Sequence, residues 1–159
     1  MNPPPTPHPD GGHSRAAGDP PFCPLLLGAG ALFAGLGVVA GAMGAHALRT
    51  VLSDHMLIIY ETAVRYQMYH ALALLVLTAL APRLPRCTVR WSGGFFIAGI
   101  LLFSGSLYML SLTGTRPLGM LTPIGGSCFI LGWLTLLWSA FRLARSQASG
   151  RTRTAARTM

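Results

Sequence analysis

Four apolar blocks, each about 20 residues long, constrain this chain more than any other feature, because about 20 apolar residues span the hydrocarbon core of a bilayer. Hydrophobic residues make up 52% of the sequence and charged residues only 10%, whereas about a quarter of a soluble domain is charged. The mean hydropathy of +0.51 agrees. We therefore predict an all-α membrane protein whose one folded domain, residues 25–141, is a bundle of four transmembrane helices.

The predicted spans cover about residues 25–45, 63–81, 93–112 and 123–141. A helix is expected to start after Ser53 as N-cap and to continue to Ala81, since no glycine or proline interrupts it. Residues 54–61 are amphipathic, and we predict that they form an interfacial segment leading into the second span. Gly114 is expected to end the third helix.

The two ends of the chain differ from the apolar blocks. Residues 1–24 are rich in proline and are predicted to be a disordered cytoplasmic tail. Metal binding by the tail residues His8 and His13 is a weaker alternative. Residues 142–159 are polar and basic, which predicts a flexible cytoplasmic tail. Cleavage of the first block as a signal peptide near His46 is disfavoured, because this block is longer than the 7–15 residues of a signal core.

Arginine sets the predicted orientation, since the formal net charge of +8 arises without any lysine. With both termini in the cytoplasm, most arginines lie on the cytoplasmic side, as the positive-inside rule requires. These cytoplasmic arginines are Arg15, Arg83, Arg86, Arg90, Arg142, Arg145, Arg151, Arg153 and Arg157, whereas Arg49, Arg65 and Arg116 lie outside. Most of the charge flanks apolar blocks, so the lipid bilayer is the expected partner and nucleic acid is not.

Small residues indicate how the spans pack, because they let helix backbones approach closely in lipid. Gly37, Gly41 and Ala45 follow at four-residue spacing in the first span, and Gly132 belongs to a small-residue stripe in the fourth. These stripes predict helix packing within the bundle or a homo-oligomer interface. The three cysteines lack metal-site spacing, and we predict neither a metal nor a cofactor.

The second span raises a separate problem, because its purely apolar part, residues 71–81, is only about 16 Å long at ~1.5 Å per residue. Tyr66, Gln67 and His70 must therefore enter the membrane, where polar groups must face protein or water. Helical spacing then predicts one intramembrane polar cluster in the outer half of the bundle. Its members are His46, Glu61, Arg65, Tyr66, Gln67, His70, Ser104 and Tyr108.

Two interpretations of this cluster remain open at the level of sequence. It can be a network of hydrogen bonds between helices that fixes their register. Alternatively, it can bind a small polar ligand or relay a proton, with His70 as the titrating group. No spacing between the residues separates the two.

Four segments together resemble the small membrane-protein family known as domain of unknown function 423, which includes bacterial YgdD and YwdK and the vertebrate transmembrane protein 256. The segments are GAMGAHAL (41–48), ETAVRYQMYHALALL (61–75), FSGSLYML (103–110) and LGMLTPIGGSCFILGW (118–133). The resemblance implies a four-helix protein of the bacterial inner membrane and brings no activity with it. The matching positions are Gly41, Gly44, His46, Glu61, Arg65, Tyr66, Gln67, His70, Ser104, Gly105, Ser106, Tyr108, Thr122, Pro123, Gly125, Gly126 and Gly132.

The residues of the chain bear on three classes of function. Only four acidic residues exist, and no nucleophile with a base, paired carboxylates or nucleotide-binding motif is present, so an enzyme is not expected. A non-enzymatic structural or accessory protein that packs with other membrane proteins fits best. The alternative is an oligomeric transporter, channel or proton-linked binder of a small ligand that uses the polar cluster around His70.

Overall fold

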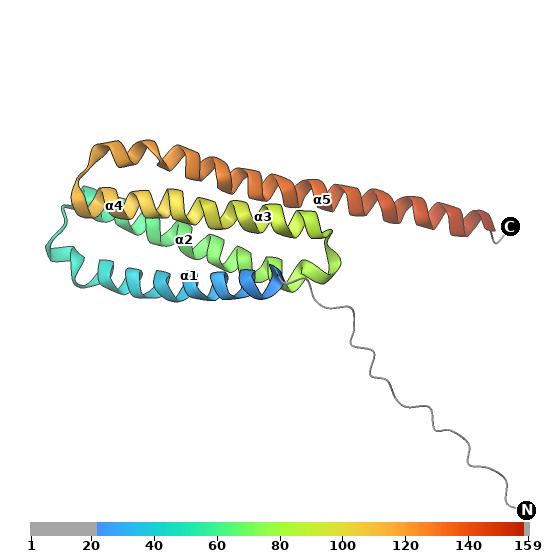
Figure 1. Ribbon diagram of the computed structural model, residues 1–159, viewed down its shortest axis with the longest axis horizontal. Coiled ribbons are helices and arrows are strands. Elements are labelled where there is room, and N and C mark those ends of the chain that lie inside the picture. Colours follow the sequence, from blue (N-terminus) through green and yellow to red (C-terminus); the bar gives the residue numbers. More distant parts are fainter. Residues whose placement is uncertain (1–21, 158–159) are drawn as a thin grey trace, which may run out of the picture.

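The computed structural model describes residues 22–157, which form helices joined by short connections (Figure 1). The long helices and the segments between them follow in the order α1 (Phe22–Ala45), η1 (Leu48–Thr50), α2 (Asp54–Leu80), η2 (Ala81–Arg83), α3 (Arg86–Gly99), η3 (Ile100–Ser104), α4 (Gly105–Thr113), η4 (Arg116–Met120) and α5 (Thr122–Arg157). The segment η3 is a turn of π-helix that joins α3 and α4 into one continuous rod. The tail predicted to be disordered lies outside the described residues, apart from residues 22–24, which begin α1.

Four helical stretches are long and apolar enough to cross a membrane. They are Cys23–Thr50, Asp54–Arg83, Arg86–Thr113 and Pro117–Ser146. This result confirms the predicted fold class, a membrane protein of four transmembrane helices. Large apolar side chains such as Leu32, Val76 and Leu131 remain exposed on the outer surfaces of the helices, as expected where lipid rather than water surrounds them.

The helix ends follow local sequence signals. The Ser53 side chain accepts a hydrogen bond from the backbone N–H of Met56 at 3.4 Å and caps the start of α2. Gly114 ends α4 with φ +69°, and its N–H donates to the carbonyl of Leu110 at 2.9 Å. This left-handed conformation is one that glycine adopts without steric cost. Both features agree with the predicted boundaries.

The C-terminal region differs from expectation. The sequence predicts a flexible segment from residue 142, whereas α5 continues as helix to Arg157. Its extension projects past the other helices in Figure 1. No proline follows Pro123, so no residue of this segment lacks the backbone N–H that a helix needs, and its alanines and arginines favour helix although Gly150 does not.

The helices form two pairs that meet in the middle of the molecule. α1 packs mainly against α2, α5 packs mainly against α3 and η3, and α2 contacts α3, η3 and α4. In Figure 1, α1 and α5 therefore lie on opposite sides of the bundle. The buried hydrophobic core between them consists of Leu26, Leu74, Leu77, Val89, Phe96, Ile100 and Phe129.

The small residues singled out in the sequence lie at these contacts, with one exception. A Cβ at Gly37 would meet Met68 at 3.2 Å, and a Cβ at Gly41 would meet Val64 at 3.5 Å, so both glycines face α2. A Cβ at Gly132 would lie 2.5 Å from the Phe96 ring. Ala45, by contrast, is exposed.

Candidate functional site

His70 is the most completely engaged of the predicted polar residues. It lies on α2, its side chain is 5% exposed, and its Nδ1 is 2.9 Å from the carbonyl oxygen of Tyr66. Its Nε2 is 3.3 Å from the indole Nε1 of Trp133 on α5. Because a carbonyl oxygen only accepts and an indole N–H only donates, the proton sits on Nδ1 and Nε2 is the acceptor. Both ring nitrogens of a neutral imidazole are thus used within the protein.

Aromatic rings surround the same imidazole. The Phe129 ring stacks on it with centroids 3.5 Å apart and an interplanar angle of 9°. Phe96 and Tyr66 follow at 5.5 and 6.2 Å. These rings come from α2, α3 and α5, so His70 lies where the two helix pairs meet. Such an environment excludes water from the imidazole.

Gln67, three residues before His70, points to α1, the partner of α2 in its own helix pair. Its side chain is 5% exposed and its Nε2 donates to the carbonyl oxygen of Phe33 on α1 at 2.8 Å. Gly37, one turn further along α1, lies against the same amide. The short side chains on α1 therefore let Gln67 reach a backbone acceptor, and the two polar residues bind different helices.

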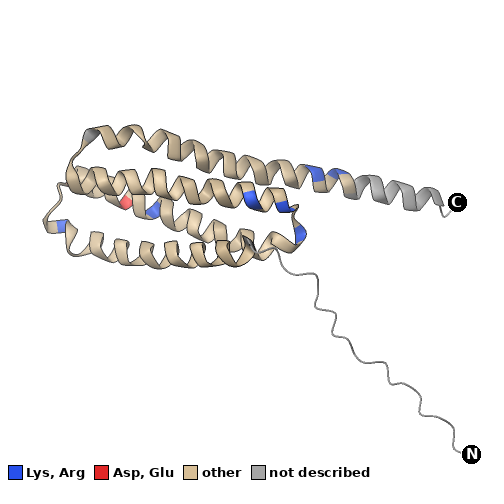
Figure 2. Ribbon diagram, in the orientation of Figure 1, with Lys and Arg blue, Asp and Glu red and all other residues tan. Residues whose placement is uncertain are grey.

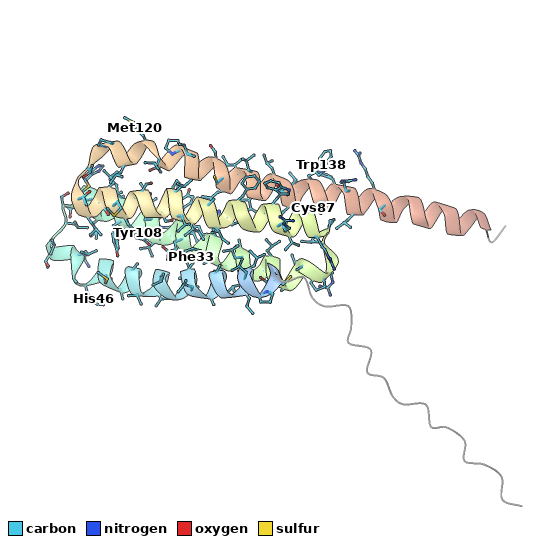
Figure 3. All side chains as sticks on the ribbon, in the orientation of Figure 1. Phe33, His46, Cys87, Tyr108, Met120 and Trp138 are labelled. Atoms are coloured by element: carbon cyan, nitrogen blue, oxygen red, sulfur yellow. The ribbon has the colours of Figure 1, made fainter. Side chains whose placement is uncertain are left out.

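Two tyrosines form a second polar location nearer the α1–α2 connection. The Tyr60 hydroxyl donates to the carbonyl of Ala40 at 3.1 Å, and the rings of Tyr60 and Tyr108 lie 5.1 Å apart. Among the described residues, neither the Tyr108 hydroxyl nor the Ser104 hydroxyl has a hydrogen-bond partner, although both oxygen atoms are buried. Figure 3 shows Tyr108 near this end of the bundle.

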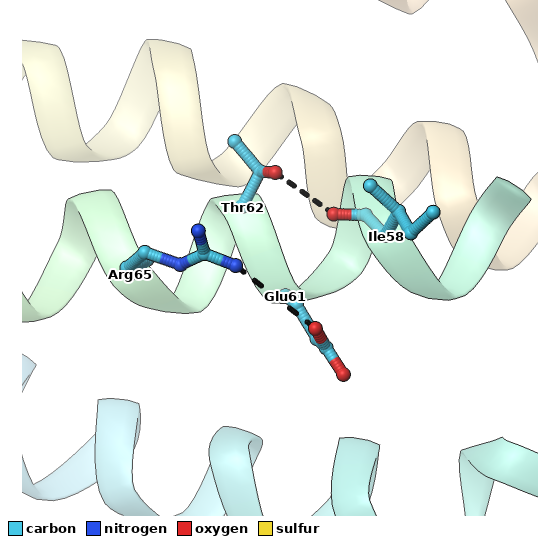
Figure 4. Close-up of polar contacts among 4 residues, drawn as sticks. All are labelled: Ile58, Glu61, Thr62 and Arg65. Atoms are coloured by element: carbon cyan, nitrogen blue, oxygen red, sulfur yellow. Dashed lines mark hydrogen bonds and ion pairs between the residues drawn. The ribbon is translucent and has the colours of Figure 1, made fainter. Parts of the chain in front are cut away.

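The remaining predicted members lie outside these two locations. Arg65 and Glu61 form an exposed ion pair at 4.0 Å (Figure 4), a type that contributes little to stability. In the same view the Thr62 hydroxyl donates to the carbonyl of Ile58 within α2. His46 is exposed at the end of α1 (Figure 3). The structure thus distributes the predicted residues over several sites instead of one cluster.

Three partners in these sites were not predicted from the sequence: Trp133, Phe129 and Tyr60. Trp133 offered a signal, because it lies inside an apolar span instead of at its end, and a buried indole N–H usually has an acceptor. Tyr60 offered a weaker signal, because it directly precedes Glu61, a member of the predicted polar cluster. Nothing in the spacing indicated that Phe129 would stack on the imidazole.

Within the described part of the chain, no group of three or more histidine, cysteine, aspartate or glutamate side chains could hold a metal ion. Cys23 and Cys128 are partly buried and Cys87 is exposed, all three as free thiols.

Known proteins similar to this chain are membrane proteins whose names give no activity. The family model described as protein of unknown function (DUF423) matches residues 40–126. A UPF0382 membrane protein of Staphylococcus aureus is 47% identical over 120 residues, which cover 76% of this chain and 98% of that protein. UPF0382 membrane proteins of Staphylococcus haemolyticus and Staphylococcus epidermidis are 45% and 49% identical, over 74% and 72% of this chain and 96% and 93% of theirs.

No solved structure matches this chain. The names of these relatives place them in a membrane and give no activity. The matches cover nearly the whole length of each relative. The resemblance seen in the four sequence segments is therefore confirmed: this chain belongs to the DUF423 family of membrane proteins of unknown function.

Proposed function

We propose that this chain is a non-enzymatic accessory protein of the bacterial inner membrane that packs against other membrane proteins through α1. The observation that carries the proposal is the outward face of α1. Gly28, Ala31, Gly35 and Ala42 are all exposed, and a Cβ at Gly28 or Gly35 would meet nothing within 4 Å. This stripe of small residues lies on the side of α1 that α2 does not cover.

A second helix could approach such a stripe closely. Small residues at helix contacts are the usual means by which helices associate in lipid, where no hydrophobic effect drives them together. The opposite face of α1 illustrates the principle, because its glycines Gly37 and Gly41 already receive side chains of α2. The outward stripe has the same composition and is open.

The surroundings of His70 favour this function over the transporter or proton-relay alternative. A relay requires a ring nitrogen that can exchange protons with a mobile donor or acceptor. Here Nδ1 is bound to the Tyr66 carbonyl and Nε2 to the Trp133 indole. The imidazole instead links α2 to α5 through a hydrogen bond, which is a structural role.

The distribution of charge supports the orientation that is part of the proposal, with both termini in the cytoplasm. Arg83, Arg86 and Arg90 lie at the α2–α3 connection, and Arg142 and Arg145 lie at the same end on α5 (Figure 2). Arginine next to transmembrane segments is retained on the cytoplasmic side. Labelling of a cysteine introduced at position 115, near the opposite end, by a membrane-impermeant reagent in intact cells tests this orientation.

The proposed function is tested by purification in a gentle detergent, followed by identification of co-migrating membrane proteins. The double variant Gly35→Leu/Ala42→Leu fills the outward stripe of α1. The matched control is Gly105→Leu/Ala79→Leu, which places the same side chains at an open glycine and an exposed alanine elsewhere. We expect the α1 variant to lose a defined partner and the control to retain it.

Two results contradict the proposal. One is recovery of the wild-type chain as a monomer without a partner. The other is equal retention of the partner by both double variants, which would place the contact away from α1. Self-association lost only in the α1 variant identifies a second copy of this chain as the partner and supports the proposed surface.

A further inference from the structure

The outward face of α3 carries a groove of about 530 Å³ near the start of the helix. Its lining consists of Cys87, Arg90, Trp91, Gly94, Phe95 and Ala98. All six residues belong to α3, and the groove does not depend on the polar residues around His70. Its volume lies within the range of about 300–1,000 Å³ that ligand sites in proteins occupy.

The sequence of α3 explains how one helix face forms a groove. Trp91 and Phe95 are four residues apart, and their ring centroids lie 5.8 Å from each other. Gly94 beside them has no side chain, and a Cβ there would meet nothing within 4 Å. Two large aromatic walls next to a missing side chain leave a hollow that is apolar along most of its length.

One end of this hollow is strongly positive. Arg90 lines it, and Arg86 lies one helical turn earlier on the same helix. Figure 2 shows only basic residues coloured at this end of the described chain. The acidic residues that the structure describes, Asp54 and Glu61, lie at the beginning of α2, toward the other end of the bundle. No described carboxylate is therefore available to neutralise these arginines.

We propose that this groove binds an anionic phospholipid from the surrounding leaflet. The lipid phosphate contacts the guanidinium groups of Arg90 and Arg86, which suit phosphate because of their planar set of donors. One acyl chain follows Trp91, Gly94 and Phe95 toward the bilayer centre. A positive end that continues into an aromatic hollow matches the two parts of such a molecule, and aromatic rings of this kind gather at the membrane interface.

A second groove repeats this chemistry on another helix. It measures about 600 Å³ and is lined by Trp138, Phe141, Arg142 and Arg145 of α5. Figure 3 shows Trp138 and Cys87 at the same end of the molecule. Because arginine occurs beside exposed aromatic rings in both grooves, the basic end as a whole is suited to contact lipid headgroups at one depth.

The test uses the full chain reconstituted in bilayers that contain phosphatidylglycerol or phosphatidylcholine with brominated acyl chains, which quench tryptophan fluorescence on contact. Subtracting the signal of Trp91→Phe isolates the contribution of Trp91. We expect phosphatidylglycerol to quench Trp91 at a lower fraction of total lipid than phosphatidylcholine does. Removal of each arginine should lower the preference for phosphatidylglycerol over phosphatidylcholine about fivefold, given the attraction of one cation to anionic lipid.

Two variants and one control separate the groove from general surface attraction. Arg86→Gln/Arg90→Gln removes the positive end, and Gly94→Leu fills the hollow without changing any charge. Arg49→Gln/Arg65→Gln removes the same charge at the other end of the bundle. We expect the first two to lose the preference and the control to keep it. If Gly94→Leu does not fold, Ala98→Leu fills the same groove.

Several results would overturn the proposal. Equal quenching by both lipids in the wild type excludes a site for anionic lipid. If Arg86→Gln/Arg90→Gln loses the preference and Gly94→Leu keeps it, the lipid is attracted to the charged surface and does not occupy the groove. Equal loss in the control excludes a site at this end. A Trp91 that neither lipid quenches, in a chain that migrates as a dimer, shows that a second copy covers the groove.

Discussion

The two helix pairs of the bundle are held together by similar bonds but differ in how closely their backbones approach. Between α1 and α2, the Gln67 and Tyr60 side chains donate to backbone carbonyls of the facing helix. Between α3 and α5, Ser92 does the same to the carbonyl of Gly132 at 3.1 Å. A polar side chain bound to a backbone acceptor is thus a feature of both pairs.

The glycines of the two pairs are not equivalent, however. On α1, a Cβ at Gly37 would meet the end of the Met68 side chain at 3.2 Å, and one at Gly41 would meet the Val64 side chain at 3.5 Å. On α5, a Cβ at Gly132 would lie 2.5 Å from the Phe96 ring, and one at Gly125 would overlap the backbone of Phe103. Gly125 and Gly132 of α5 therefore require glycine, whereas Gly37 and Gly41 of α1 tolerate a methyl group. Gly30 of α1 is an exception, because a Cβ there would lie 2.8 Å from the Leu75 side chain. We expect the inner contact of α5 to be rigid and that of α1 to be adjustable around Gly37 and Gly41.

The largest effect should come from Gly125→Ala. The added methyl group would collide with the backbone of Phe103 in η3, which cannot rotate away as a side chain can. We expect the free energy of unfolding to fall by about 3 kcal/mol, the upper part of the usual range for overpacking. Unfolding by sodium dodecyl sulfate from a mild detergent, followed by circular dichroism, measures this change.

The neighbouring Gly126 provides the control. A Cβ there would meet the Phe103 side chain at 3.7 Å, an ordinary van der Waals distance, and alanine favours helix over glycine by up to ~1 kcal/mol. Gly126→Ala should therefore retain or raise stability. Equal losses at both positions would mean that α5 crosses η3 differently from the arrangement described.

A smaller effect should come from the bond that connects the two pairs. His70→Phe and Trp133→Phe each remove one partner of the 3.3 Å contact between Nε2 and the indole N–H. In a double-mutant cycle we expect a coupling energy of about 1 kcal/mol, within the values measured for hydrogen bonds inside membranes. The same unfolding titration applies to all four proteins of the cycle. Additive losses, with no coupling, would show that the contact does not link α2 to α5.

The sequence predicts a structural feature best when that feature depends on residues close together along the chain. The start of α2 at Ser53 and the end of α4 at Gly114 were predictable, because each depends on a residue and its immediate neighbours along the chain. The spans were predictable because their length and composition follow from the thickness of the bilayer. The persistence of α5 beyond residue 141 was not, since its polar composition was interpreted as a flexible tail although its alanines and arginines favour helix.

The candidate site was predictable in its members more than in its geometry. Gln67 and His70 were expected to be buried polar residues, and both are 5% exposed. Their three-residue spacing suggested one shared cluster, yet a rotation of about 100° per residue leaves them at an angle of about 60° to each other on the helix. In a helix with neighbours on two sides, that angle is enough for one residue to face α1 and the other α5. Only packing decides which helix lies where.

A smaller change in stability should distinguish Tyr60 from Tyr108, whose rings are in tilted contact. The Tyr60 hydroxyl donates to the Ala40 carbonyl, whereas the buried Tyr108 hydroxyl has no partner among the described residues. Tyr60→Phe should lower the free energy of unfolding by about 0.5–1 kcal/mol, the net value of one hydrogen bond. Tyr108→Phe should leave it unchanged or raise it, because it removes an unsatisfied polar group. A loss in Tyr108→Phe as large as in Tyr60→Phe would show that Tyr108 has a partner, such as a bound molecule.

The smallest effect should come from Gly41→Ala in the adjustable pair. A Cβ at this position would contact Val64 at 3.5 Å, which is ordinary van der Waals contact, and the methyl group also favours helix. We therefore expect the free energy of unfolding to change by no more than about 0.5 kcal/mol, as for substitutions that disturb no packed contact. Gly44→Ala sharpens the measurement, because its Cβ would lie 3.1 Å from the Tyr60 ring and a small loss is expected there. If Gly41→Ala instead costs as much as Gly125→Ala, both pairs require glycine equally, and α1 is no more adjustable than α5.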